Sequence, residues 1–365
     1  MSVFTKLYRG ETRFDFIGTR RRWYLASLGL ILICLLSFFL RGFNVGIDFK
    51  GGTEFQLPSG TSVTTTQAEN AMTAAGQTTE GAAQQVGSGS TRSIIIKTKE
   101  LDQQQQSDVA GKLAAALKID KSQISINSVS STWGSEITKK AVQGLIVFLI
   151  AVFLYISIRY EWKMGVGALT ALVHDLIISA GIYSIVGFEL TPSTIVGLLT
   201  ILGFSLYDTV VVFDKVNENV KDLGATARMT YSEAANLAVN QTLMRSINTS
   251  LISLLPVGGL LFVGAGLLGV GTIKDLALIL FVGLAVGAYS SLFLATPIVV
   301  ELKEREPENK NLARRVLAKR ATAARAGEPV MVGAPVTAAK PRPTGKPAPA
   351  PRPGARPANR PRKRP

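Results

Sequence analysis

The chain has 365 residues, a formal net charge of +15 and a hydrophobic fraction of 47%. Its hydrophobic residues are gathered into long runs, which is typical of a protein that crosses a membrane several times and argues against a soluble globular domain. One histidine, His174, and one cysteine, Cys34, exclude a disulfide within the chain and a histidine- or cysteine-rich metal site.

The N-terminal segment, residues 1–22, is polar and ends in three arginines. The apolar run of about Trp23–Leu40 that follows is too long for the core of a cleaved signal peptide and lacks a small-residue cleavage site. We therefore predict an uncleaved first transmembrane helix over residues 23–41. Because positive residues are enriched on the cytoplasmic side, we expect residues 1–22 in the cytoplasm.

Residues 42–135 contain no long apolar run and are rich in Ser, Thr, Gln and Gly. Hydrophobic periodicity predicts strands and helices in the order β-α-β-β-α-β, at 45–57, 64–75, 84–86, 93–97, 101–117 and 123–129. This order is that of a ferredoxin-like α+β domain. Since one membrane helix precedes it, we expect the domain to be extracytoplasmic.

Residues 136–302 contain five further apolar runs, at about 142–158, 164–186, 194–216, 247–268 and 276–300. With the first run they predict a polytopic α-helical membrane protein of six transmembrane helices. The loop 159–163 carries positive and aromatic residues, whereas the loop 187–192 has no Lys or Arg, so both termini are expected in the cytoplasm. We expect a separate short interfacial helix at Tyr231–Met244.

The C-terminal tail is strongly basic. From Glu301 onward there are 17 Lys and Arg against 5 Glu, a net of +12. Residues 303–365 are expected to form a disordered cytoplasmic tail rich in Pro, Ala and Arg. Two interpretations stay open: a solvated tail that follows the positive-inside rule, or a contact with anionic lipid or with the RNA of a ribosome.

An acidic residue, Asp208, interrupts the apolar run 194–216. It lies about 21 Å along the helix from Thr194, near the middle of a bilayer core. An aspartate at this depth is unfavourable by about 2.5–3.5 kcal/mol, and such residues often mark an ion or proton pathway. The alternative is a structural carboxylate that hydrogen-bonds to neighbouring helices.

Other polar residues accompany it within the predicted helices. Asp175 lies near mid-membrane beside His174, which is either a proton relay or a packed polar residue. Asp214 precedes Lys215, and we expect these two to form an ion pair near the cytoplasmic surface. Arg245 opens the fifth helix near the cytoplasmic edge. Its side chain either extends outward to the membrane surface or points inward. If it points inward it pairs with Asp208, and protonation of Asp208 would release it.

Small residues form a second pattern. Gly283 and Gly287 lie four residues apart in the sixth run, with serines after them, and predict a face for close helix packing. Pro256 and Pro297 predict kinks.

Three segments, in order along the chain, carry a resemblance to the SecD/SecF family. The G-x-D-F-x-G-G signature is matched by Gly46, Asp48, Phe49, Gly51 and Gly52. Residues 205–219 resemble the S-x-N-D-x-V-V-x-F-D-R-x-R-E-N block of the fourth membrane helix. Residues 240–250 resemble the Q-T-x-x-R-x-x-x-T-S block. Tyr207 replaces the usual Asn, and residues 215–217 depart at the basic positions.

The resemblance covers about residues 23–301. It implies the SecF branch of the bacterial Sec protein-export machinery, related to resistance-nodulation-division transporters and driven by the proton-motive force. By position, Asp208 is the proton-responsive carboxylate, Arg245 its switching partner, and Asp175 and Asp214 secondary polar positions. The implied location is the bacterial plasma membrane.

The resemblance also implies the molecules that the chain works with. These are a SecD-like subunit that supplies the other half of the bundle, the Sec channel with its associated subunits, and the preprotein. No enzymatic activity, nucleotide, metal or other cofactor is implied. Two other interpretations remain open from the residues: half of a small-molecule exporter, and a non-transporting scaffold of the channel.

Overall fold

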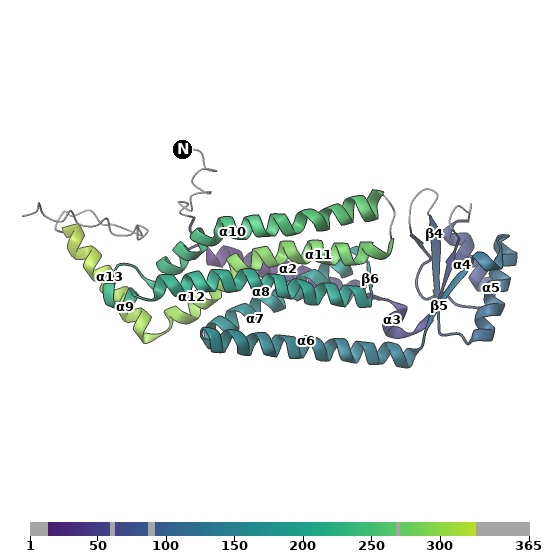
Figure 1. Cartoon of the computed structure of the whole chain (residues 1–365), viewed down its shortest axis with the longest axis horizontal. Helices are drawn as coiled ribbons and strands as arrows, with labels where there is room; N and C mark the ends of the chain where they lie inside the picture. Colours follow the sequence, from purple (N-terminus) through teal and green to yellow (C-terminus); the bar gives the residue numbers. More distant parts are fainter. Residues whose placement is uncertain (1–13, 59–62, 87–91, 268–270, 326–365) are drawn as a thin grey trace, which may run out of the picture.

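The computed structural model describes residues 14–58, 63–86, 92–267 and 271–325. A bundle of long helices runs along the long axis of the molecule (Figure 1). A unit of strands and two helices lies at one end of the bundle, and the helix α13 lies at the other.

Six helices in the described ranges are long and apolar enough to cross a membrane, which confirms the six predicted spans. They are built from α2 (Arg20–Arg41), α6 (Ser131–Arg159), α7 (Trp162–Val186), α8 (Pro192–Val220), α10 (Tyr231–Gly259) and α11 (Gly271–Ser290). The α10 span runs on into the π-helical segment η3 (Leu260–Leu267). The α11 span continues through the π-helical turn η4 (Ser291–Ala295) into α12 (Thr296–Glu304).

Helix α7 lies inside the bundle, and its glycines let neighbouring helices approach it. A Cβ atom on Gly181 would lie 2.2 Å from Cys34 of α2, and one on Gly167 would lie 2.5 Å from Val299 of α12. The predicted Gly283 and Gly287 face packs α11 against α8, where the Cβ positions would lie 2.2 Å from Ile201 and 3.0 Å from Ser205. Close packing of α7, α8 and α11 therefore depends on the missing side chains.

The unit between α2 and α6 contains four antiparallel strands in the order β3-β4-β2-β5. Its elements are β2 (Gly52–Leu57), α4 (Thr65–Ala74), β3 (Gln84–Val86), β4 (Ser93–Thr98), α5 (Gln103–Leu117), a short 3-10 turn η2 (Lys121–Gln123) and β5 (Ser125–Val129). Residues of β2, β4 and both helices form one core, which includes the buried Phe55, Met72, Ile96 and Leu113.

The single strand predicted at 45–57 is wrong. The chain instead forms β1 (Asn44–Val45), one helical turn α3 (Ile47–Lys50) and then β2. Gly51 and Gly52 end the turn with φ values of 80° and 143°. Glycine adopts positive φ values far more readily than other residues, which explains its presence at both positions. Strand β1 pairs in parallel with β6 (Glu189–Leu190), which lies between α7 and α8.

The separate interfacial helix predicted at Tyr231–Met244 is also wrong. Helix α10 runs without a break from Tyr231 to Gly259. Thr230 and Glu233 form a capping box that starts it, and no Gly or Pro interrupts it before Pro256. The amphipathic segment and the fifth apolar run are two parts of one helix.

The predicted disordered tail begins too early. Helix α13 spans Pro307–Arg325, beside the short α9 (Leu223–Thr226). Leu312 and Val316, one turn apart, are buried against Leu223 and neighbouring residues. The basic composition hides this narrow apolar stripe. Residues 326–365 lie outside the described residues.

An ion pair fixes the far part of α13. The guanidinium of Arg320 donates to both carboxylate oxygens of Glu233 on α10, at 2.7 and 2.8 Å. This bidentate geometry is the stronger form of the Arg–carboxylate contact.

Replacing Leu312 by Asp should undock α13. Loss of this buried leucine costs about 3 kcal/mol, which corresponds to an undocked fraction raised by about a hundredfold. Tryptic cleavage at Lys and Arg residues of α13 should accelerate accordingly. Leu317→Asp is the matched control, because Leu317 is 60% exposed. Equal cleavage rates for the two variants would contradict the docking of α13.

Candidate functional site

Asp208 is buried in the middle of the bundle, with 7% of its surface exposed. Helix α8 carries it, and a capping box between Thr191 and Thr194, with Pro192 in the first turn, starts that helix. Both carboxylate oxygens accept hydrogen bonds from hydroxyl groups. Ser246 of α10 donates to Oδ1 at 2.7 Å, and Ser291 of η4 donates to Oδ2 at 2.6 Å.

Asp175 forms a second buried carboxylate site on α7, with 1% exposure. Its Oδ2 accepts hydrogen bonds from Ser205 of α8 at 2.6 Å and from Ser290 of α11 at 2.8 Å. Its Oδ1 lies 3.1 Å from Nδ1 of the neighbouring His174. The structure thus brings Asp175 and Asp208 into one polar layer that joins α7, α8, α10 and α11.

The two carboxylates share one structural element. Ser290 bonds to Asp175 and the next residue, Ser291, bonds to Asp208, at the start of the π-helical turn η4. π-Helical turns are rare and occur frequently at functional sites. A change at either carboxylate therefore acts on the same turn of the α11 span.

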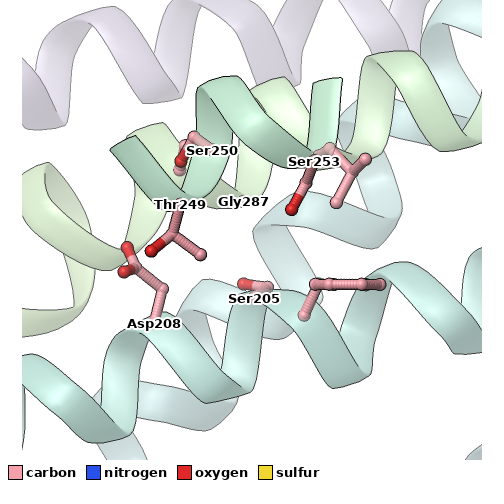
Figure 2. Close-up of a pocket in the computed structure, with 9 residues that line it drawn as sticks. Ser205, Asp208, Thr249, Ser250, Ser253 and Gly287 are labelled. Carbon is pink, nitrogen blue, oxygen red and sulfur yellow. The ribbon is translucent and has the colours of Figure 1, made fainter. Parts of the chain in front are cut away.

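A small cavity of about 30 Å³ adjoins Asp208, large enough for one or two water molecules. Figure 2 shows Asp208 and Ser205 on one side of it and Thr249, Ser250 and Ser253 of α10 on the other. The polar run in the fifth predicted helix therefore faces the carboxylate.

The expected ion pair between Asp208 and Arg245 is not among those formed by the described residues. Arg245 is exposed, and its Nη2 donates to the hydroxyl of Tyr207 at 3.1 Å. The reason is the register between α8 and α10. In this register Asp208 contacts Ser246, and Arg245 contacts Tyr207 instead of Asp208. Arg245 also lies level with Asp208 along the bundle, in the middle of α10 rather than at the start of a helix.

The expected ion pair between Asp214 and Lys215 is also wrong. Lys215 pairs with Glu218 one turn later, at 2.9 Å. Asp214 is exposed, and its Oδ1 accepts from the hydroxyl of Tyr160 at 3.5 Å. The structure therefore places Asp214 at the junction of α6 and α7, outside the layer of buried carboxylates.

The glycine-rich signature forms a joint between the α+β unit and the bundle. Gly46 precedes α3, which contains Asp48 and Phe49, and Gly51 and Gly52 follow it. A Cβ atom on Gly51 would lie 2.5 Å from the backbone of Ser131, where α6 begins. This signature serves backbone packing, and it lies away from Asp208.

The arrangement suits a carboxyl group that gains and loses a proton. A serine hydroxyl can donate to a carboxylate or accept from a carboxylic acid, so each form of Asp208 can keep its partners. A fixed counter-charge would favour the ionised form alone.

Sequence reasoning missed the serines that hold these carboxylates. Ser205, Ser290 and Ser291 lie in apolar runs, and Ser246 lies at the start of one, where a hydroxyl group needs a partner on a neighbouring helix. A serine in such a position predicts a hydrogen bond between helices, but the sequence does not indicate which aspartate each serine contacts.

Two family models match the chain. The model of the C-terminal region of the protein export membrane protein SecD/SecF matches residues 109–305, and the model of the SecD/SecF GG motif matches residues 36–63.

Curated relatives and solved structures agree with these matches. The chain is 46% identical to the protein translocase subunit SecF of Streptomyces coelicolor, over 88% of the chain and 86% of that protein. It is 47% identical to the SecF of Mycobacterium tuberculosis, over 89% and 75%. The crystal structure of the translocon-associated membrane protein SecDF from Thermus thermophilus is similar with a TM-score of 0.71 and 35% identity. That match covers 81% of this chain and 39% of the SecDF chain.

Proposed function

The chain belongs to the SecD/SecF family of protein-export membrane proteins, and on this basis we propose that it couples the proton-motive force to protein export. It is a multi-pass membrane protein with a role in transport rather than in catalysis. We place it in the bacterial plasma membrane, where it assists late steps of preprotein movement through the Sec channel.

The buried Asp208 carries this proposal. Among the described residues, the hydroxyl groups of Ser246 and Ser291 hold its carboxylate, so protonation changes its charge without removing these hydrogen-bond partners. The change in charge alters the strength of the hydrogen bonds between Asp208 and its two serine partners. Because Ser291 belongs to the π-helical turn η4, a change in its hydrogen bond shifts that turn. We propose that this local shift starts the movement that assists export.

A SecD-like subunit is the partner that we propose for the exposed face beside Asp208. Arg245 presents a charge there at the depth of Asp208, which is costly against lipid and favours a protein partner. The surrounding side chains of Phe204 and Tyr207 on α8 and Leu251 on α10 are also exposed. This chain matches less than half of the fused SecDF, which leaves room for a second half.

We assign the unit between α2 and α6 to the ferredoxin-like arrangement and place it outside the cytoplasm. Its β-α-β-β-α-β order and its antiparallel sheet, with β2 and β4 in the centre, support the assignment. In this orientation the α13 end of the bundle is cytoplasmic. There the basic tail is available to anionic lipid or to a ribosome.

Cysteine labelling tests this orientation. Gln104→Cys on α5 should react with an impermeant thiol reagent added outside intact cells, because the position is exposed. Ala321→Cys on α13 should react only after the membrane is opened. The native Cys34 is buried and gives a low background. The opposite labelling pattern would reverse the orientation.

Release from membrane vesicles tests the proposed function. Vesicles that contain this chain, a SecD-like subunit and the Sec channel are loaded with a model secreted protein and given a proton gradient. Release should increase with the gradient and return to the basal rate when an ionophore dissipates it. A rate that is indifferent to the gradient would contradict the coupling.

A further inference from the structure

A second, larger cavity of about 540 Å³ lies between α2, α7 and α12. Glu301 and Arg305 stand at its rim, near the α13 end of the bundle, and His174 lies at its wall beside Asp175. Most of its remaining lining is apolar, with Leu28, Ile177 and Ile298 among the residues. The cavity therefore leads from the charged end of the bundle to the buried carboxylate site.

Two buried polar atoms of residues that line this cavity have no hydrogen-bond partner within the described parts of the chain. They are the hydroxyl oxygen of Tyr24 and Nε2 of His174. His174 is 2% exposed, and its other ring nitrogen already contacts Asp175. Buried polar groups are nearly always paired, and ordered water commonly fills this role. Ser27, Thr170, Glu301 and Arg305 add polar groups to the lining, and the cavity is open to the surface. Water can therefore enter it and pair with both atoms.

We propose that this cavity is a water-filled path through which His174 exchanges protons between the α13 end of the bundle and Asp175. The inference rests on the proposed proton coupling and adds to it a route and a relay residue. Glu301 lies at the entrance of the path, and Tyr24 lines its wall.

The transfer balances without any other reactant. A hydronium ion in the cavity gives one proton to Nε2 of His174, while Nδ1 gives its proton to Oδ1 of Asp175. The products are one water, a neutral imidazole with its proton on Nε2, and a neutral carboxylic acid. The reverse pair of transfers unloads Asp175 into the cavity. If the proton leaves Asp175 by another route, the imidazole must return to its first tautomer before the next cycle. Nε2 then gives its proton to a water molecule and Nδ1 takes one from a water molecule.

The groups that face His174 come from four helices. Asp175 bonds to it from α7, and the ring of Tyr289 on α11 lies 6.0 Å away between centroids. Tyr24 of α2 and the Glu301–Arg305 ion pair of α12 line the same cavity. The Glu301–Arg305 pair is largely exposed and carries no net charge. The electrostatic environment of His174 therefore depends mainly on Asp175.

Thiol labelling tests for water in the cavity, independently of export. In a Cys34→Ala background, Thr170→Cys lines the cavity, and Leu30→Cys is the control on the exposed apolar surface of α2. A charged methanethiosulfonate should label Thr170→Cys at least about tenfold faster, because the reactive thiolate forms only in water. Equal, slow labelling at both positions would overturn the path, even where a His174 variant fails to fold.

Gradient-driven release tests the relay. In the vesicles described above, His174→Gln should lower gradient-stimulated release by about a hundredfold, the lower end of what a positioned proton-transfer group contributes. Imidazole added on the α13 side should restore release by His174→Ala, since the vacated space can admit it, whereas a purely structural loss would not respond.

The outcomes separate the relay from the proposed function. If Asp208→Asn abolishes gradient stimulation while His174→Gln keeps it, the relay is wrong and the proton coupling stands. If the wild-type chain shows no gradient stimulation, both are wrong. Loss of stimulation in His174→Ala with recovery in imidazole supports the relay.

Discussion

Replacing Asp208 by Asn should abolish the stimulation of export by a proton gradient while the protein still inserts and associates with its partner. The asparagine keeps the size of the side chain but holds a neutral charge at every pH, so it imitates the protonated state permanently. A group that cannot cycle between two charge states cannot transmit the gradient.

The structure explains why this variant should fold. The amide oxygen can accept from Ser246, and the amide nitrogen can donate to Ser291. The hydroxyl of Ser291 then has an alternative acceptor, the carbonyl of Ala288 at 3.2 Å. Removing a buried charge is often neutral or stabilising, so a loss of export would not reflect misfolding.

The measurement is gradient-stimulated release from vesicles at matched protein levels. Asp208→Glu should retain part of the stimulation, because the group still titrates. Asp222→Asn is the matched control, since Asp222 is exposed just beyond the end of α8. Normal stimulation in Asp208→Asn would make this carboxylate structural and move the coupling role to Asp175.

Replacing Gly283 by Leu should prevent stable accumulation of the protein. A Cβ atom at this position would lie 2.2 Å from Ile201 of α8, so α11 and α8 would have to separate. Overpacking of this kind costs about 3 kcal/mol, near the upper end of the usual range. The separation would also move Ser291 away from Asp208.

Matched variants distinguish this clash from a general intolerance of leucine. Gly203→Leu on α8 should accumulate normally, because no described atom outside the local helix backbone and the two chain neighbours lies within 4 Å of a Cβ atom there. Adding Ile201→Ala to Gly283→Leu should restore part of the stability, as expected for residues in direct contact. Accumulation and thermal unfolding in detergent measure both effects. If Gly203→Leu is as damaging as Gly283→Leu, the packing explanation fails.

The bundle could be predicted from the sequence because long apolar runs have few alternatives to membrane helices. Asp208 and Asp175 stood out for the same reason, since a carboxylate is costly in such a run. The close-packing face formed by Gly283 and Gly287 also followed from small-residue spacing, although the helix that it contacts did not. Each of these features is encoded within one helix.

The contacts between helices could not be predicted in the same way. Whether Asp208 meets Arg245 or Ser246 depends on a rotation of about 100° per residue between two packed helices. The π-helical turn at Ser291 also rotates the side chains of the α11 span, which changes the residues that this span presents to Asp208. Helix α13 was missed because the stripe formed by Leu312 and Val316 is narrow within a basic segment.

Infrared difference spectroscopy of the reconstituted complex tests most directly whether Asp208 exchanges a proton. Acidification of the side from which protons enter should produce the C=O stretching band of a buried carboxylic acid in the wild-type protein. We expect Asp208→Asn to lose this band, or the part of it that Asp208 contributes, and Asp222→Asn to keep it. An unchanged band in Asp208→Asn would show that another group carries the proton and would contradict the role of Asp208.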